Sequence, residues 1–83
     1  MYSVYVLRSE KDGLIYIGQT NDLKLRILRH QKGYVKSTRN RRPLKLIYFE
    51  EYRDRGTAMR REKFLKSGAG HNLLNSKLGR RGP

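Results

Sequence analysis

One carboxylate lies where the sequence predicts the apolar face of a helix. Ala58, Glu62 and Leu65 are spaced so that on a helix they share the stripe facing the rest of the protein. A carboxylate there must be ion-paired, hydrogen-bonded or bound to a cation, because burying it alone is costly. One interpretation is a partly buried salt bridge to a nearby arginine. The other is a ligand for Mg²⁺ or Mn²⁺, which needs few protein oxygens when water and phosphate complete its shell.

Two tyrosines, an arginine and a histidine form a second group of candidates. Tyr5 and Tyr16 lie on segments that predict paired strands, so their hydroxyls are expected on one face of a hairpin. Arg26 and His30 are four residues apart on a predicted helix and therefore share a face. Ordinary sheet packing of the tyrosines and a solvated pair on the helix are the alternatives without a catalytic role.

The strands that must position these tyrosines are marked by composition and turns. Residues 2–7 and 14–18 are rich in aromatic and β-branched side chains, and residues 11–13 between them read Lys-Asp-Gly, a turn signal. A third strand is predicted over 44–49, directly after Pro43.

Helices are predicted between and after these strands. The first covers about 22–32 and the second about 54–66, where residues 67–70 (Ser-Gly-Ala-Gly) are expected to stop it. Residues 33–42 are polar and basic and predict a loop, and 71–79 predict a short third helix. The order β-β-α-β-α predicts an α+β fold, with a three-stranded, mainly antiparallel sheet flanked by helices.

The charge of the chain is one-sided and concentrated in two segments. Twenty Lys and Arg against seven Asp and Glu leave a formal net charge of +13 over 83 residues. Nearly all of the excess lies in residues 24–42, which contain no acid, and in residues 60–81, where Glu62 is the single acid. Such charge favours a phosphate backbone as partner, because each neutralised phosphate releases counterions.

Composition excludes several classes of protein. The absence of cysteine rules out a disulfide framework, a cysteine-based zinc site and thiol catalysis. The sequence has no run of 18 apolar residues and no charged-then-apolar leader, so we expect neither a spanning helix nor a signal peptide, and a cytoplasmic location. The length allows one domain with a small core.

Taken together, the candidate residues resemble the GIY-YIG nuclease superfamily. The residues and motifs that carry the resemblance are Ser3-Val4-Tyr5, Tyr16-Ile17-Gly18, Arg26, His30 and Glu62. Residues 39–48 and 58–66 resemble the small, stand-alone single-domain branch of that superfamily. We therefore expect one GIY-YIG-like domain over 1–79, with its core at about 2–67 and a disordered tail at 80–83.

The resemblance implies a role for each candidate residue. Tyr5 and Tyr16 match the tyrosines of the two motifs, either of which would activate the attacking water. Arg26 would stabilise the pentacovalent phosphate, and His30 would assist proton transfer or contact the phosphate. Glu62 matches the single protein carboxylate that holds a divalent metal, Mg²⁺ or Mn²⁺.

Two features depart from the family pattern. The first motif reads Ser-Val-Tyr at residues 3–5 in place of Gly-Ile-Tyr, which keeps the tyrosine. Larger members carry a late asparagine that supports the site, for which Asn72 and Asn75 are the candidates here.

The resemblance implies a metal-dependent endonuclease that hydrolyses phosphodiester bonds in DNA, with little sequence specificity and a preference for single-stranded or branched DNA. A protein partner would then supply target specificity. The alternative is a non-catalytic nucleic-acid-binding module, or a partner-dependent DNA repair subunit, on the same fold. Backbone contacts are expected from basic residues and a stacking contact from one tyrosine, namely Arg29, Tyr34, Lys36, Arg39, Arg41, Arg42, Arg60, Arg61 and Lys63.

Overall fold

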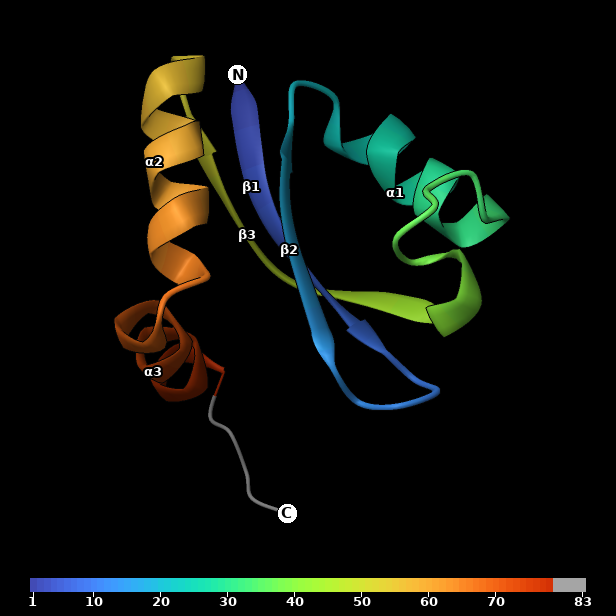
Figure 1. The fold of residues 1–83 in the computed structure, drawn as a ribbon. Coiled ribbons are helices and arrows are strands. Elements are labelled where there is room, and N and C mark those ends of the chain that lie inside the picture. The colour runs from blue at the N-terminus through green and yellow to red at the C-terminus, as the bar shows by residue number, and fades with distance from the viewer. Residues whose placement is uncertain (79–83) are drawn as a thin grey trace.

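The computed structural model of the chain describes residues 1–78, which form a three-stranded antiparallel sheet and three α-helices (Figure 1). The strands are β1 (Tyr2–Ser9), β2 (Ile15–Thr20) and β3 (Leu44–Tyr52). They lie in the order β2-β1-β3, so β1 is the central strand and pairs with both neighbours. The predicted α+β fold is confirmed. The expected tail at 80–83 lies outside the described residues.

Helices cover both faces of this sheet (Figure 1). Helix α1 (Leu23–Lys32) packs on one face, and α2 (Arg55–Leu65) and α3 (Gly68–Lys77) pack on the other. A short 3₁₀ helix, η1 (Arg39–Arg41), interrupts the segment that the sequence predicted as a loop. Within residues 1–78, no helix is long and apolar enough to cross a membrane.

Both ends of α1 are capped. The Asp22 side chain accepts a hydrogen bond from the backbone N–H of Leu25, which satisfies a donor that has no partner inside the helix. At the other end Gly33 adopts a left-handed conformation with φ of 83°, and its N–H bonds back to the last turn.

The boundary between α2 and α3 differs from the prediction. The sequence predicted that residues 67–70 separate two helices, whereas α3 already begins at Gly68 and Ser67 caps it by accepting from the N–H of Gly70. A Cβ atom at Gly70 would collide with the backbone of Phe64 and Leu65. Gly70 therefore permits a close approach of the two helices rather than simply ending one of them.

The central strand supplies side chains to two separate cores. Val4 and Val6 point to one face, where they pack with residues of α2 and α3 such as Leu65. Tyr5 and Leu7 point to the opposite face, toward α1. This alternation follows from the period of two in a strand. It places Tyr5, a polar-ended side chain, in the small core beneath α1.

A partly buried carboxylate joins α2 to the sheet. Glu50 on β3 receives two hydrogen bonds from Arg61 on α2, at 2.7 and 2.9 Å, and one each from the hydroxyls of Tyr48 and Tyr52. Burial raises the pKa of Glu50, but these hydrogen bonds outweigh it and lower the pKa to about 2. Glu50 is therefore ionised throughout the range in which the protein would work.

We predict that Glu50→Gln destabilises the fold by about 2 kcal/mol at neutral pH, because the charged hydrogen bonds to Arg61 are lost. The folded pKa is depressed, so the stabilisation is complete above the ordinary value of 4.5 and is lost as the pH falls toward about 2. Urea unfolding of both proteins as a function of pH measures this. The difference between them should be constant above about pH 5 and shrink below it.

The matched control is Glu51→Gln, which removes the same charge from the neighbouring, exposed residue of β3. This variant should unfold like the wild type. Equal loss of stability in both variants would mean that net charge, rather than the Glu50 contacts, is responsible.

Candidate active site

The hydroxyl of Tyr5 is the centre of a buried polar group. Tyr5 is fully buried, and its hydroxyl oxygen lies 2.9 Å from Nε2 of His30. The same oxygen accepts a hydrogen bond from Nε of Arg26, at 3.3 Å. Three of the four residues predicted to be catalytic therefore meet at one atom.

Strand register and helix spacing explain why these residues meet. Tyr5 pairs with Gly18 across β1 and β2, and Leu7 pairs with Tyr16, so both tyrosines lie on the face covered by α1. The ring centroids of Tyr5 and Tyr16 are 6.2 Å apart, and Tyr16 also meets the His30 ring edge-on at 5.1 Å. The tyrosines thus share one face, as predicted.

The helix residues are less exposed than a surface pair would be. Arg26 and His30 are one turn apart and share a face of α1, as their spacing predicted. However, His30 is fully buried and Arg26 is partly buried. The alternative of a solvated pair is therefore wrong, because the Tyr5 hydroxyl offers both side chains a polar partner beneath the helix.

Thr38 completes the buried group, and sequence reasoning missed it. Its hydroxyl oxygen lies 2.8 Å from Nδ1 of His30, and its side chain is fully buried. Thr38 stands just before η1, within the polar and basic segment that predicted a solvated loop. Only the path of that segment back over α1 brings the threonine inside, and residue types alone carry no signal of this path.

Burial sets the charge state of the group. Burial raises the pKa of Tyr5 to about 12, against the opposing effect of the Arg26 hydrogen bond. Burial, with the Arg26 charge, lowers the pKa of His30 to about 4. The hydrogen bond to Tyr5 raises the pKa of Arg26. At neutral pH the group therefore holds a protonated tyrosine, a neutral histidine and a charged arginine.

Arg26 connects the buried group to the protein surface. This residue lines a surface hollow of about 410 Å³ with residues from the ends of β1 and β2 and the start of α2, namely Tyr2, Gln19, Thr20, Asn21 and Arg55. A smaller hollow of about 170 Å³ joins Arg26 to Arg29 on the next turn of α1. Tyr16 is partly exposed, whereas Tyr5 is not. A substrate would therefore meet Arg26 and Tyr16 first.

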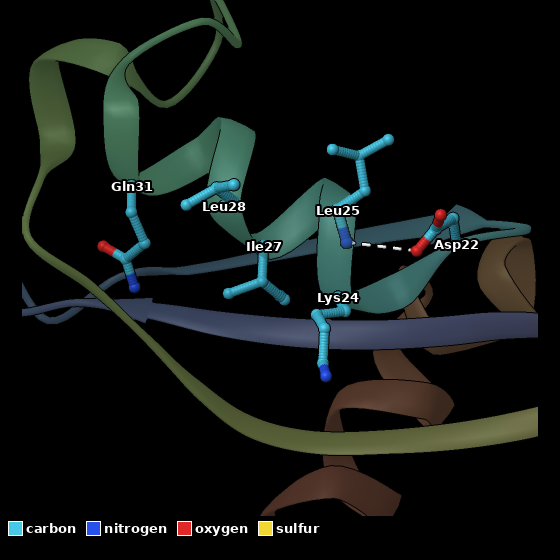
Figure 2. A pocket seen from close by; sticks show the side chains of 6 residues that line it. All are labelled: Asp22, Lys24, Leu25, Ile27, Leu28 and Gln31. Carbon is cyan, nitrogen blue, oxygen red and sulfur yellow. Dashed lines mark hydrogen bonds between the residues drawn. The ribbon is translucent and has the colours of Figure 1, made fainter.

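A further hollow, of about 480 Å³, lies on the other side of α1 (Figure 2). Its lining is mainly aliphatic, and Leu25 and Leu28 on its rim are 44% and 48% exposed. Lys24 and Gln31 supply polar groups at its edge. No member of the Tyr5 group lines it, so this hollow is not part of the candidate active site.

Glu62 is separate from the buried group. It lies on α2, across the sheet from α1, and no hydrogen bond or ion pair within residues 1–78 links it to Tyr5 or its partners. Its side chain is 22% exposed, and its Oε2 lies 2.9 Å from Nζ of Lys66. The predicted salt bridge is present, although the partner is a lysine one turn further along α2 and not an arginine.

The donor set at Glu62 limits the kind of metal site. Among the described residues, no group of three or more His, Cys, Asp or Glu side chains could hold a metal ion. One carboxylate suits Mg²⁺ or Mn²⁺ with a shell completed by water and phosphate oxygens, which is the arrangement that the resemblance implied. The residues therefore fit a substrate-assisted ion and do not fit a protein-only cage.

The residues predicted to bind nucleic acid fall into two groups. Seven are exposed, namely Arg29, Tyr34, Lys36, Arg39, Arg42, Arg60 and Lys63. Arg61 is held by Glu50, and Nε of the partly buried Arg41 lies 3.6 Å from Asp12. The latter two arginines support the fold, so the six exposed basic residues are the better candidates for phosphate contacts, and Tyr34 stays the candidate for stacking.

Asn72 and Asn75, the two candidates for a supporting asparagine, are exposed on α3. This helix packs against α2, on the other side of the sheet from Tyr5. Within residues 1–78 no side-chain hydrogen bond joins either asparagine to the site, and their role stays a prediction.

Steric contact with the Tyr5 ring explains why residue 18, in the second motif, is a glycine. The Tyr5 ring lies over Gly18, so a Cβ atom there would stand 2.7 Å from the Tyr5 oxygen and 2.8 Å from its Cζ. It would also stand 3.0 Å from Cε2 of Tyr16. A glycine at position 18 therefore leaves the space that the Tyr5 ring occupies over β2.

We predict that Gly18→Ala displaces the Tyr5 ring and destabilises the fold by about 2 kcal/mol, as overpacking of a small core does. Chemical denaturation and the NMR signals of the His30 ring measure the two effects. Gly68→Ala is the control, because a Cβ atom there meets nothing within 4 Å, and it should change stability by less than about 0.5 kcal/mol. Unchanged stability and unchanged His30 signals in Gly18→Ala would contradict the steric account.

Comparison with known proteins places this site in a family. The model of the GIY-YIG catalytic domain matches residues 1–75. A UPF0213 protein of Clostridium perfringens is 43% identical over 67 residues, which cover 80% of this chain and 71% of that protein. A UPF0213 protein of Staphylococcus saprophyticus is 35% identical over 65 residues, covering 77% of this chain and 78% of that protein.

The fold agrees with the same assignment. The solution NMR structure of a UPF0213 protein from Bacillus halodurans superimposes with a TM-score of 0.57 at 35% identity, covering 92% of this chain and 84% of that one. The buried tyrosine with its arginine and histidine, the glycine beneath it and the match to residues 1–75 agree with one another. The chain therefore belongs to the GIY-YIG family of nuclease-type catalytic domains, among the small UPF0213 proteins.

Proposed function

We propose that the protein is a metal-dependent endonuclease that hydrolyses phosphodiester bonds in DNA. The observation that carries the proposal is the way Tyr5 holds Arg26. The Tyr5 hydroxyl engages Nε, while the two terminal nitrogens make no ion pair within residues 1–78. An arginine anchored in this way can bind a phosphate through its terminal nitrogens and stabilise the charge that develops during hydrolysis.

The two tyrosines are suited to different tasks. Tyr5 is fully buried with a pKa of about 12, so it is a poor base and we assign it to holding Arg26 and His30. Tyr16 is partly exposed beside them, and we assign it to the attacking water. A tyrosine needs a nearby cation to act as a base near neutral pH, and Arg26, bonded to the neighbouring Tyr5 hydroxyl, is the candidate cation.

Glu62 is the residue that would hold the metal. A bound Mg²⁺ or Mn²⁺ would stabilise negative charge on the phosphate and on the leaving oxygen. The ion would compete with Lys66 for the carboxylate, since the lysine is the present partner of Glu62. The same ion pair also suits a nucleic-acid-binding module without metal, which is the alternative function.

The surface supports a backbone-directed mode of binding. Lys36, Arg39 and Arg42 are exposed on the segment that follows α1, and Tyr34 beside them is 73% exposed. Phosphate contacts from such residues carry no sequence information, and an exposed tyrosine offers a stacking surface to an unpaired base. We therefore propose a single-stranded or branched DNA substrate with little sequence specificity, and a protein partner that supplies the target.

We predict that the wild type cleaves single-stranded or branched DNA in Mg²⁺ or Mn²⁺, and that Glu62→Gln and Tyr16→Phe each lower the rate by at least about 100-fold, as loss of a transition-state contact does. Glu51→Gln removes a carboxylate outside the site and should cleave like the wild type. Single-turnover gel assays with and without a chelator measure these rates. Cleavage that survives both site substitutions would contradict the mechanism, and tight binding without any cleavage would favour the binding module.

We also predict where DNA binds. Replacing Lys36, Arg39 and Arg42 by Gln should weaken binding and reduce the slope of log affinity against log salt by about 2, at roughly 0.7 per phosphate contact on a single strand. The control replaces three other exposed basic residues, Arg8, Lys45 and Lys77, and lowers the net charge equally. Fluorescence anisotropy with a labelled oligonucleotide measures both slopes. Equal slopes for the two variants would place the binding surface elsewhere.

A further inference from the structure

Five groups form one continuous chain of polar contacts beneath α1. Arg26 Nε donates to the Tyr5 hydroxyl at 3.3 Å, and that hydroxyl lies 2.9 Å from His30 Nε2. His30 Nδ1 lies 2.8 Å from the Thr38 hydroxyl, which in turn donates to the backbone carbonyl of Val35 at 3.5 Å. Tyr5, His30 and Thr38 are all fully buried, so water does not replace any partner in the middle of this chain.

The two ends of the chain determine the direction of every hydrogen bond in it. A guanidinium only donates, so the Tyr5 oxygen accepts from Arg26, and a carbonyl only accepts, so Val35 receives a proton. Within residues 1–78, the shortest hydrogen-bond contact of the Tyr5 hydroxyl is the one to Nε2 of His30, at 2.9 Å, and burial, with a minor contribution from a contact with Tyr16, raises the pKa of Tyr5. With the Tyr5 proton donated to this closest partner, Nε2 is unprotonated, and the His30 proton lies on Nδ1, pointing at Thr38.

We propose that Thr38 is a positioning residue that holds His30 in the Nδ1–H tautomer and, through Tyr5, fixes the orientation of Arg26. The opposite tautomer would aim two N–H groups, those of His30 and Arg26, at the Tyr5 oxygen, and would turn the Tyr5 proton away from its shortest hydrogen-bond contact. An unconstrained neutral histidine prefers its proton on Nε2, so the Nδ1–H form requires an acceptor at Nδ1. Thr38 supplies that acceptor.

The position of Thr38 gives this contact a consequence for substrate binding. It lies between the exposed Lys36 and Arg39, on the segment proposed to bind DNA. The same short segment therefore presents cations to solvent and, on its inner side, orients the group that holds Arg26. This consequence for cleavage rests on the proposed function, whereas the tautomer itself does not depend on it.

The tautomer is measured directly by ¹⁵N NMR of the histidine ring nitrogens near neutral pH, where His30 is uncharged because its pKa lies at about 4. The other histidine, His71, is exposed on α3, and His71→Gln assigns the His30 signals. In the wild type we expect a protonated Nδ1 and an unprotonated Nε2. A wild-type spectrum with the proton on Nε2 would overturn the proposal, whether or not any variant folds.

Two substitutions test the role of the hydroxyl itself. Thr38→Val keeps the shape of the side chain and removes the acceptor, so His30 should shift toward the Nε2–H form. Thr38→Ser keeps the hydroxyl and should restore the wild-type spectrum. An unchanged tautomer in Thr38→Val would also overturn the proposal, because the Tyr5 hydroxyl at Nε2, and not Thr38, would then determine the tautomer.

Cleavage rates separate this inference from the proposed function. If the protein is a nuclease, Thr38→Val should lose about 10-fold in rate and Thr38→Ser much less, since one hydrogen bond orients the group indirectly. A full rate in a Thr38→Val protein whose tautomer has shifted would overturn the positioning role. No cleavage by any form, with the expected tautomers present, would refute the nuclease function and leave the control of the tautomer by Thr38 intact.

Discussion

The structure depends on satisfying one buried hydroxyl. Tyr5 lies on the central strand, points into the smaller of two cores and is fully excluded from water. A buried hydroxyl without partners is costly, so the chain must bring hydrogen-bonding groups to it. It does so with Arg26 and His30, one turn apart on α1. The same contacts that make the burial of Tyr5 tolerable hold an arginine at the edge of the site.

This requirement explains features that are distant in sequence. Gly18 must lack a side chain, because the Tyr5 ring occupies the space above it. The segment after α1 must return over the helix, so that Thr38 can meet the far nitrogen of His30. The larger apolar core lies on the other face, where α2 and α3 cover Val4 and Val6 and Arg61 is bound to Glu50. One face of the sheet therefore carries the larger apolar core under α2 and α3, and the other carries the polar group of Tyr5, Arg26 and His30 under α1.

Much of this arrangement could be predicted from local patterns. Strand pairing predicted that Tyr5 and Tyr16 share one face, and the four-residue spacing predicted that Arg26 and His30 share another. The expectation that the two pairs form one site came from the resemblance to the GIY-YIG superfamily. The contacts of Thr38 and of Glu50 could not be predicted, because each depends on the path of the chain between elements and not on a repeating pattern. The i,i+4 spacing of Glu62 and Lys66 permits the ion pair that the structure shows. The sequence also places several arginines near Glu62, and an arginine was the partner predicted.

The central claim is that Arg26, held by Tyr5, is the residue that receives the phosphate. The most direct measurement is an NMR titration with a short single-stranded oligonucleotide, following the Nε–H signal of the Arg26 side chain. The account predicts that this signal shifts on saturation while the His30 ring signals keep the tautomer of the free protein. An Arg26 signal that does not move, while the residues of the 33–42 segment saturate with DNA, would contradict it.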